Sequence, residues 1–579
     1  MDDMTGAQVL ELTRKPGNLS ADPIVFFDGV GFGTSVGLLS KLTGALQGQG
    51  LALDMQGEWL AVIREPEATV VHTDGFGFNH LFYTTPELNG AGIAAASASF
   101  EALVAYLRDR GCPPSADIAY ALPLIASTGS FFNQGYSPRT SCVQIKRLLP
   151  GETIRVTAEG CSVVPNAKWS EQSDADYHDL IDIGISKVRH QLASLNADGV
   201  HQKELYLSGG KDSRTCLSLM LARRSRDFTC TTHGTGGKRG LVSEVLVRDF
   251  AISSQLVSHY NLRWSEPVEK QTEWKTFAEC LADYRRFRSN KYYSFSPSNF
   301  HTQSKNDRIH MEIHGGCGEA LRGYWAKYFR NLPISARFKV SRGNVWHDAA
   351  IIFQSLVQRQ SMPEELYSLA LREFVVDMRE VPGNTIYEVL DNHYILHRNR
   401  YHFGNVRQAY EAGKLLYYPL AQKEFLLASQ KIPHASRCQG KLLYDIIEQS
   451  TPSAHLFPYE SGFFECAQPP KAHIPVTEQA LREVSEEHQA TQEAQRLQSR
   501  DLYAAGRNYD IPTAMNELAR TNLEKIMDGS KELRAVYEGQ QVGRNSKALA
   551  ASTRNHYIAR LDGIAQVFDP QQAYEIIAI

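Results

Sequence analysis

The segment 208–213 reads Ser-Gly-Gly-Lys-Asp-Ser and combines residue types that bind phosphate groups. Its two glycines let backbone N–H groups approach an anion closely, and the hydroxyls of Ser208 and Ser213 add donors. A carboxylate inside such a cradle, here Asp212, is understandable when a divalent cation neutralises it. We therefore expect this segment to bind a polyphosphate together with Mg²⁺.

The flanking sequence predicts a strand before this loop and a helix after it. Leu205 and Leu207 lie on one face of an alternating segment, which is typical of a β-strand. After the loop, apolar residues recur at i,i+4 spacing and predict a helix with one buried face. These residues are Cys216, Leu217, Met220 and Leu221. The sequence has no Gly-x-x-x-x-Gly-Lys-Ser/Thr segment, so a Walker-type phosphate loop is not expected.

Two further predicted strands end near glycines. Beyond about residue 175, strands alternate with amphipathic helices, as in a parallel sheet covered by helices. Residues 228–232 predict a second strand and residues 309–313 a third. Because ligands of open α/β sheets gather at the carboxyl ends of strands, all three ends predict one nucleotide site. Its expected residues are Leu207, Ser208, Gly209, Gly210, Asp212, Ser213, Thr232, His233 and Gly316.

Composition narrows the class of protein. The 579 residues are 42% hydrophobic and 22% charged with a net charge of −3, which is typical of a soluble protein with more than one domain. No broad basic field predicts nucleic-acid binding. The sequence shows neither a basic leader nor a long apolar run, so we expect neither secretion nor a membrane span. Nine cysteines occur without a Cys-x-x-Cys pair, which favours reduced thiols and a cytoplasmic location.

The pattern divides the chain into three parts. Residues 1–172 are rich in predicted strands, including a hairpin over 59–71 and a strand, turn and strand over 145–154. Residues 173–475 carry the alternating α/β pattern, and residues 476–579 are polar and helical. We expect the charge-dense start of this last part to be a solvated helix face.

The order of motifs resembles the asparagine synthetase and β-lactam synthetase family over roughly residues 50–470. Its Ser-Gly-Gly-x-Asp-Ser loop is similar to that of the ATP pyrophosphatases, which split ATP between the α and β phosphates. The other matching segments are 57–62, 74–77, 81–83, 145–151, 314–319, 397–400, 418–420 and 440–443. The resemblance implies an α/β fold with a glutaminase-like α/β/β/α sandwich before an ATP-binding parallel-sheet domain.

The N-terminal part departs from the glutaminase pattern. A working glutaminase of this type needs a cysteine as its first residue after Met removal, because the free α-amine activates the thiol. Position 2 is Asp2, and the first cysteine is Cys112. We therefore expect a degenerate domain that does not release ammonia from glutamine, as in the β-lactam synthetases.

The resemblance also implies a second magnesium ligand. The family's Ser/Thr-Gly-x-Gly-x-Asp segment corresponds to residues 316–319, which are one residue shorter and end in Glu319. The longer glutamate side chain can reach a similar point, so Asp212 and Glu319 form the expected metal pair. The alternative is that Glu319 is only stabilised by a helix N-terminus.

Two residues stand where the family has catalytic groups, and a third residue is an alternative to one of them. Cys317 replaces a tyrosine or glutamate, and Tyr459 stands where a lysine stabilises the acyl-adenylate. Lys471 follows twelve residues later and is the alternative lysine. A packing role for Cys317 and a solvated role for Lys471 remain the alternatives, because an unshifted thiol is a poor base.

Four other basic residues are ambiguous. Lys211 and Arg214 lie in variable positions of the loop, where they can steer phosphate or an acidic substrate, or be solvated. Arg398 and Arg400 can pair with carboxylates of the protein or with substrate.

The chemistry implied is amide formation. ATP activates a carboxylate by placing AMP on it, and an amine then attacks while a base takes its proton. We expect an AMP-forming carboxylate–amine ligase of specialised metabolism, such as antibiotic biosynthesis, acting on small-molecule or peptide acids and amines. Ring closure within one substrate is an option, because it gains effective molarity. The sequence leaves the oligomeric state open, with a homodimer as one option.

Two alternatives to this ligase remain. The first is an ammonia-dependent asparagine synthetase, which needs no glutaminase. A nucleotide-binding protein without catalysis explains the missing lysine and the cysteine at position 317. A tRNA-modifying enzyme with the same loop is disfavoured, since it needs a basic surface and usually a cysteine pair.

Overall fold

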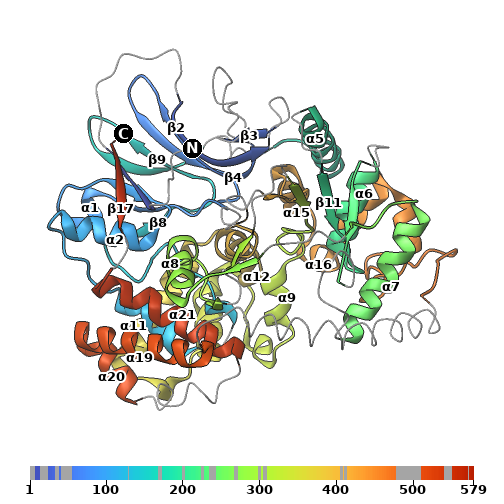
Figure 1. Cartoon of the computed structure of the whole chain (residues 1–579). Helices are drawn as coiled ribbons and strands as arrows, with labels where there is room; N and C mark the ends of the chain where they lie inside the picture. The colour runs from blue at the N-terminus through green and yellow to red at the C-terminus, as the bar shows by residue number, and fades with distance from the viewer. Residues whose placement is uncertain are drawn as a thin grey trace.

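The chain folds into an α/β structure in which an antiparallel sheet, a mixed sheet and a separate parallel sheet are surrounded by helices (Figure 1). The computed structural model describes residues 7–12, 24–32, 38–40, 55–127, 130–166, 173–197, 202–222, 227–233, 243–266, 272–297, 301–303, 310–404, 409, 414–476, 510–539, 551–570 and 573–578. Asp2, Ile309 and the charge-dense segment 477–509 lie outside these residues.

The expected hairpin near residue 60 forms the centre of a six-stranded antiparallel sheet. β4 (Gln56–Arg64) pairs with β5 (Thr69–Thr73), and Val62 lies opposite Val71. The sheet has the order β10-β9-β5-β4-β2-β3. Its remaining strands are β2 (Ile24–Phe32), β3 (Leu38–Ser40), β9 (Glu152–Val156) and β10 (Cys161–Pro165).

A second sheet packs face to face on the first. Its order is β17-β1-β7-β6-β8. Its strands are β1 (Ala7–Glu11), β6 (Phe82–Thr84), β7 (Ala95–Ser97), β8 (Lys146–Arg147) and β17 (Tyr574–Ala578). Leu60 and Val71 of the first sheet share a buried cluster with Leu10 and Ala96 of the second. The predicted strand, turn and strand over 145–154 therefore crosses between sheets, because β8 and β9 belong to different ones.

Helices cover the second sheet on its other side. α2 (Phe100–Asp109) buries Phe100 and Leu103 against Val9 of β1 and Phe82 of β6. Its N-cap is Ser99, whose side chain accepts a hydrogen bond from the Ala102 N–H, as expected for a helix start. The other helices of this part are α1 (Pro86–Asn89) and α3 (Ile118–Ala126).

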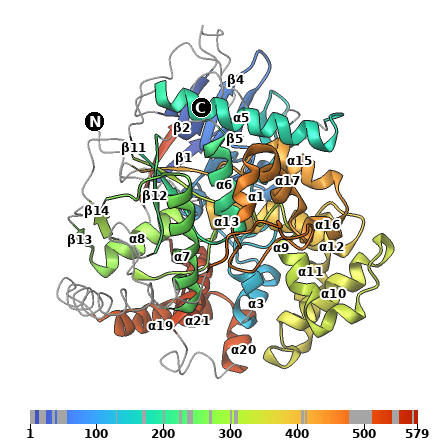
Figure 2. The same ribbon diagram turned by 90° about the vertical axis from the view of Figure 1, so that its right-hand side faces the viewer.

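The parallel sheet has the order β12-β11-β15-β16, and every pair in it is parallel. Its strands are β11 (Gln202–Tyr206), β12 (Thr229–Thr231), β15 (His310–Ile313) and β16 (Lys414–Tyr417). The three predicted strands are therefore present and adjacent. Leu205, Met311 and Ile313 are fully buried, which accounts for their alternation. Neighbouring helices are α5 (Tyr177–Ala197), α6 (Lys211–Leu221), α15 (Lys423–Lys431) and α17 (Lys441–Ser450), grouped together in Figure 2.

The remaining elements form the lower part of Figure 1 or flank the parallel sheet. They are α7 (Glu244–His259), β13 (Thr272–Trp274), α8 (Phe277–Phe287), β14 (His301–Gln303), α9 (Tyr324–Arg330), α10 (Val345–Leu356), α11 (Glu364–Glu380), α12 (Ile386–His393), a π-helix (Tyr394–Asn399), α13 (Arg400–Phe403) and α16 (His434–Cys438). None of the described helices combines the length and apolar character needed to cross a membrane.

The C-terminal part returns to the N-terminal part of the chain. It contains the expected helices, α19 (Ile511–Gly529), α20 (Lys531–Gly539) and α21 (Ala551–Phe568). It also contains a strand that the sequence did not predict, β17, which pairs in parallel with β1 (Figure 1). Asp562 of α21 is buried and accepts hydrogen bonds from Arg285 of α8, the closest being 2.8 Å. The C-terminal part is thus packed into the body of the protein.

Replacing Asp562 with Ala should lower the free energy of unfolding by about 3 kcal/mol or more. The change removes the closest carboxylate of the Arg285 guanidinium, which is only 13% exposed, and leaves it with the more distant Glu101 at 3.7 Å, and a poorly compensated buried charge is costly. Urea denaturation followed by circular dichroism measures the difference. The control is Glu524→Ala, whose partner Arg520 is 69% exposed, where a change of about 0.5 kcal/mol is expected. Equal losses in both variants would contradict this account.

Candidate functional site

The loop after β11 and the loop after β15 touch each other at the carboxyl edge of the parallel sheet. A Cβ atom on Gly315 would lie 2.8 Å from the Ser213 nitrogen, and one on Gly318 would lie 2.2 Å from Asp212 Oδ1. Side chains at these positions would overlap the first turn of α6. The two glycines therefore allow the contact, and the expected meeting of the two loops is present.

Backbone donors of the 208–213 loop already bind oxygen atoms. The Ser208 N–H donates to Ser213 Oγ (3.1 Å), and the Gly210 N–H donates to Ser208 Oγ (3.2 Å). The Gly209 N–H donates to a carboxylate oxygen, Asp249 Oδ1, at 2.9 Å. The loop thus holds a negatively charged oxygen at one of the positions where a phosphate oxygen is expected.

Asp249 reaches the loop from α7. Burial raises the pKa of Asp249 to about 6; the Glu460 carboxylate adds to the rise and the Gly209 N–H opposes it. The carboxylate is therefore mostly charged at neutral pH and becomes neutral in mildly acidic solution.

Asp212 lies at the first turn of α6 with its two oxygens in different surroundings. Oδ2 accepts a 2.6 Å hydrogen bond from Arg322 Nη2. Oδ1 is buried and has no hydrogen-bond partner among the described residues. Burial raises the pKa of Asp212, Glu319 raises it further, and Arg322 opposes both effects. A buried carboxylate oxygen without a partner is what a cation ligand requires.

The predicted metal pair is brought together. Glu319 is close enough to Asp212 to raise the pKa of that carboxyl, and it accepts a hydrogen bond from the Tyr394 hydroxyl. Tyr394 opens the π-helix, a rare element that is frequent at functional sites. Two neighbouring carboxylates with one unpartnered buried oxygen fit a magnesium ion.

Cys317 occupies the turn between these groups. It is fully buried and has a backbone φ of 71°, which is unusual for a residue other than glycine. Burial raises the pKa of its thiol. The thiol is neutral at physiological pH, which favours the packing interpretation over a role as base.

The segment 456–463 contacts the 208–213 loop through its backbone, while the side chain of Tyr459 contacts His455 and Arg214. The Glu460 N–H donates to the Gly209 carbonyl at 2.9 Å. The Tyr459 hydroxyl bonds His455 Nδ1 at 3.0 Å, and the Arg214 guanidinium lies 4.0 Å from its ring centre. Arg214 also donates to the carbonyl of Phe457 at 2.8 Å, so it is a structural tie and is not solvated.

Of the two lysines considered, Lys211 belongs to the 208–213 loop. Lys471 is exposed in a turn at 471–472, and its catalytic role stays a prediction. Lys211 is half-buried with its Nζ 4.8 Å from the centre of the Phe464 ring. Burial lowers the pKa of Lys211, and the nearby cations Arg322 and Lys327 lower it further.

The other predicted nucleotide contacts lie along the same edge. Leu207 is buried and donates its N–H to the Thr231 carbonyl at 2.9 Å. Thr232 is buried and His233 is exposed, directly after β12. A Cβ atom on Gly316 would lie 2.4 Å from the Tyr418 ring, so only glycine fits there.

Arg398 and Arg400 hold the N-terminal part against the parallel-sheet part. Arg398 donates to Gln134 Oε1 at 3.0 Å. Arg400 is buried and donates to the carbonyls of Gly77 (2.9 Å) and Leu148 (2.8 Å). Of the two earlier interpretations, these contacts favour a structural role.

A separate cluster of possible metal ligands lies within the sheet. Ligand atoms of Glu204, His310 and Glu312 are within 4.8 Å of one another. Glu312 is also 3.3 Å from Lys414 Nζ and 3.4 Å from His314 Nε2. These cationic and imidazole groups offset the carboxylates, so the cluster is explained as an ion-pair network of the sheet.

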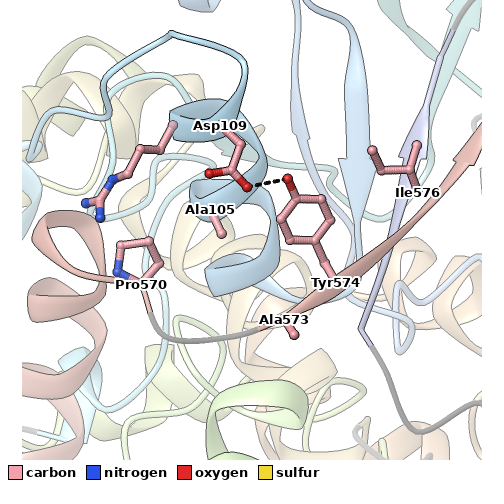
Figure 3. Close-up of a pocket in the computed structure, with 7 residues that line it drawn as sticks. Ala105, Asp109, Pro570, Ala573, Tyr574 and Ile576 are labelled. Carbon is pink, nitrogen blue, oxygen red and sulfur yellow. Dashed lines mark hydrogen bonds between the residues drawn. The ribbon is translucent and has the colours of Figure 1, made fainter.

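A cavity of about 820 Å³ lies elsewhere, between α2 and the C-terminal strand (Figure 3). Tyr574 and Asp109 line it and share a 2.6 Å hydrogen bond from the tyrosine hydroxyl. Figure 1 shows β17 and α6 on opposite sides of the molecule, so this cavity is distinct from the glycine loops.

Sequence reasoning missed Asp249, Arg322 and Tyr394. Asp249 is 40 residues from Gly209 and carries no local motif. Tyr394 belongs to a π-helix, which local periodicity does not indicate. Arg322 was detectable, because a basic residue three positions after Glu319 lies close to any anion bound there.

No protein-family model matches this chain, and no curated protein matches it significantly.

Replacing Asp249 with Asn should strengthen pyrophosphate binding at pH 8 by about fivefold. The amide oxygen can still accept from the Gly209 N–H, while removal of one like charge beside the anion is worth about 1 kcal/mol. The pKa of Asp249 near 6 makes the gain pH-dependent. At pH 5 the carboxyl is largely neutral, so wild type and variant should bind alike.

Isothermal titration calorimetry at both pH values measures this ratio. Because the affinity of the variant is divided by that of wild type at the same pH, the protonation of pyrophosphate affects both affinities equally and cancels. Glu244→Gln at the start of the same helix is the control and should behave as wild type. A gain that does not depend on pH, or weaker binding by the variant, would exclude Asp249 as a competitor for the anion position.

Proposed function

We propose that the chain is an ATP-dependent carboxylate–amine ligase, which adenylylates a carboxylate, releases pyrophosphate and transfers the acyl group to an amine. The observation that carries the proposal is Asp212, held at the N-terminus of α6 between two contacting glycine loops with one buried oxygen unpartnered. The charged oxygen of Asp249 on the Gly209 N–H supports an anion at the same loop.

The residues of the loop account for pyrophosphate departure. The positive end of α6 faces the polyphosphate, where negative charge grows as the bond between the α and β phosphates breaks, and the Gly209 N–H becomes a further donor once the Asp249 carboxylate leaves it. Lys211 adds positive charge from a half-buried position. Asp212 and Glu319 would hold a Mg²⁺ ion, which would supply further charge neutralisation for the leaving group.

The acceptor is proposed to be an amine, as the motif order implies. The two face-to-face sheets, which are antiparallel except for the added C-terminal strand β17, support a degenerate glutaminase-like sandwich over residues 1–172. We propose that the amine comes with the substrate or as free ammonia. We favour a small-molecule or peptide substrate of specialised metabolism, with intramolecular closure as one form.

ATP–pyrophosphate exchange tests adenylylation directly. Wild-type protein should catalyse exchange with one acid from a panel of amino-acid and peptide carboxylates. Asp212→Asn should reduce the rate by about 100-fold or more, because a magnesium-binding charge at the departing pyrophosphate is lost. Asp283→Asn is the matched control, since Asp283 lies on α8 and its carboxylate pairs with Lys275, which precedes that helix.

The same assay separates the alternatives. Exchange with aspartate, followed by asparagine formation from ammonium, would assign an ammonia-dependent asparagine synthetase. Magnesium-dependent ATP binding without exchange for any acid of the panel would favour a nucleotide-binding protein. Exchange that persists in Asp212→Asn would exclude the proposed site.

A further inference from the structure

Three cations surround the first turn of α6 on the side of Asp212. They are Lys211, Arg322 and Lys327: Arg322 pairs with Asp212, and both Arg322 and Lys327 act electrostatically on Lys211. The neighbouring carboxylates are Asp212 itself, Glu319 and Glu465, which acts on Lys211. The formal charges of these six groups balance, and the positive end of α6 adds positive potential. The helix end therefore favours an anion at this place.

Only some of the N–H donors of Arg322 have an acceptor among the described residues. Its Nη2 donates to Asp212 Oδ2 at 2.6 Å, and its Nε donates to the Gly318 carbonyl at 3.3 Å. A guanidinium carries five N–H donors, and these two bonds use two of them. The side chain is 29% exposed, so it is accessible to a ligand.

The pairing also occupies Asp212. Of the two carboxylate oxygens, Oδ2 is bound by Arg322, and Oδ1 is buried with no partner in the described part of the chain. A divalent cation at Asp212 competes with the guanidinium for the same negative charge. Arg322 and a metal ion therefore oppose each other in the nucleotide-free protein.

We propose that Arg322 is a phosphate-binding residue, which neutralises Asp212 in the nucleotide-free chain and pairs with the polyphosphate of ATP once a divalent cation is bound at Asp212. The inference rests on the proposed function, because it assigns a role at the same site. Guanidinium groups match phosphate oxygens with two parallel hydrogen bonds, which suits this exchange of partners.

This role predicts opposite effects on two affinities. Without Arg322, Asp212 is free for the cation, so metal binding in the absence of nucleotide becomes stronger. With metal present, the nucleotide loses a charge-assisted bond and binds more weakly. A residue that only supports the fold would not strengthen one affinity while it weakens the other.

The experiment compares wild type, Arg322→Ala and Arg322→Lys. Mn²⁺ binding is titrated by electron paramagnetic resonance without nucleotide, and α,β-methylene ATP binding is titrated calorimetrically at saturating Mn²⁺. This analogue cannot be split between the α and β phosphates. Arg322→Ala should bind Mn²⁺ about threefold tighter and the nucleotide about tenfold weaker. Arg322→Lys keeps the positive charge, so its nucleotide affinity should lie between those of wild type and Arg322→Ala.

Arg337→Ala, exposed in the segment after α9, is the control and should match wild type. Unchanged affinities in Arg322→Ala, or a parallel loss of both with a lower melting temperature, would overturn the inference. If Arg322→Ala does not fold, Arg322→Lys decides it: nucleotide affinity equal to wild type would overturn the inference. Failure of the wild type to bind α,β-methylene ATP with Mn²⁺ would instead overturn the proposed function.

Discussion

The site depends on the contact between the 315–318 loop and the first turn of α6. The contact is possible only because Gly315 and Gly318 have no side chain, as a Cβ at Gly318 would overlap Asp212 Oδ1. The close approach places Glu319 near Asp212 and excludes water from one oxygen of that carboxylate. Everything proposed about phosphate and metal binding follows from this approach of two strand ends on adjacent parallel strands.

The surroundings keep these charges in place. The π-helix brings the Tyr394 hydroxyl to Glu319, and Arg400 at its end is bound by carbonyls of the N-terminal part. The N-terminal part therefore supports the second loop. The C-terminal part adds a strand to the sheet that β1 begins, which ties the last residues to the same body.

Sequence reasoning predicted the local elements that hydrophobic alternation and glycine specify. The strand, loop and helix around Ser208 and the strand before His314 were predicted, because Leu205, Met311 and Ile313 alternate as buried positions. β17 was not predicted, since its pairing with β1 joins residues more than 560 positions apart.

Only the part of the candidate site that local motifs specify was predicted from the sequence. Asp212 and Glu319 lie in glycine-rich segments that a local motif identifies. Asp249 and Tyr394 reach the site from α7 and the π-helix, and only the three-dimensional arrangement shows their contacts. The surroundings of Cys317 and Tyr459 were also inaccessible to sequence, because burial and partners determine their proton affinity.

The most direct measurement of the central claim is anomalous diffraction from crystals grown with Mn²⁺ and α,β-methylene ATP. The account predicts a manganese peak between the carboxylates of Asp212 and Glu319, with the nucleotide phosphates against residues 208–213. A nucleotide bound elsewhere, or manganese bound away from both carboxylates, would contradict it.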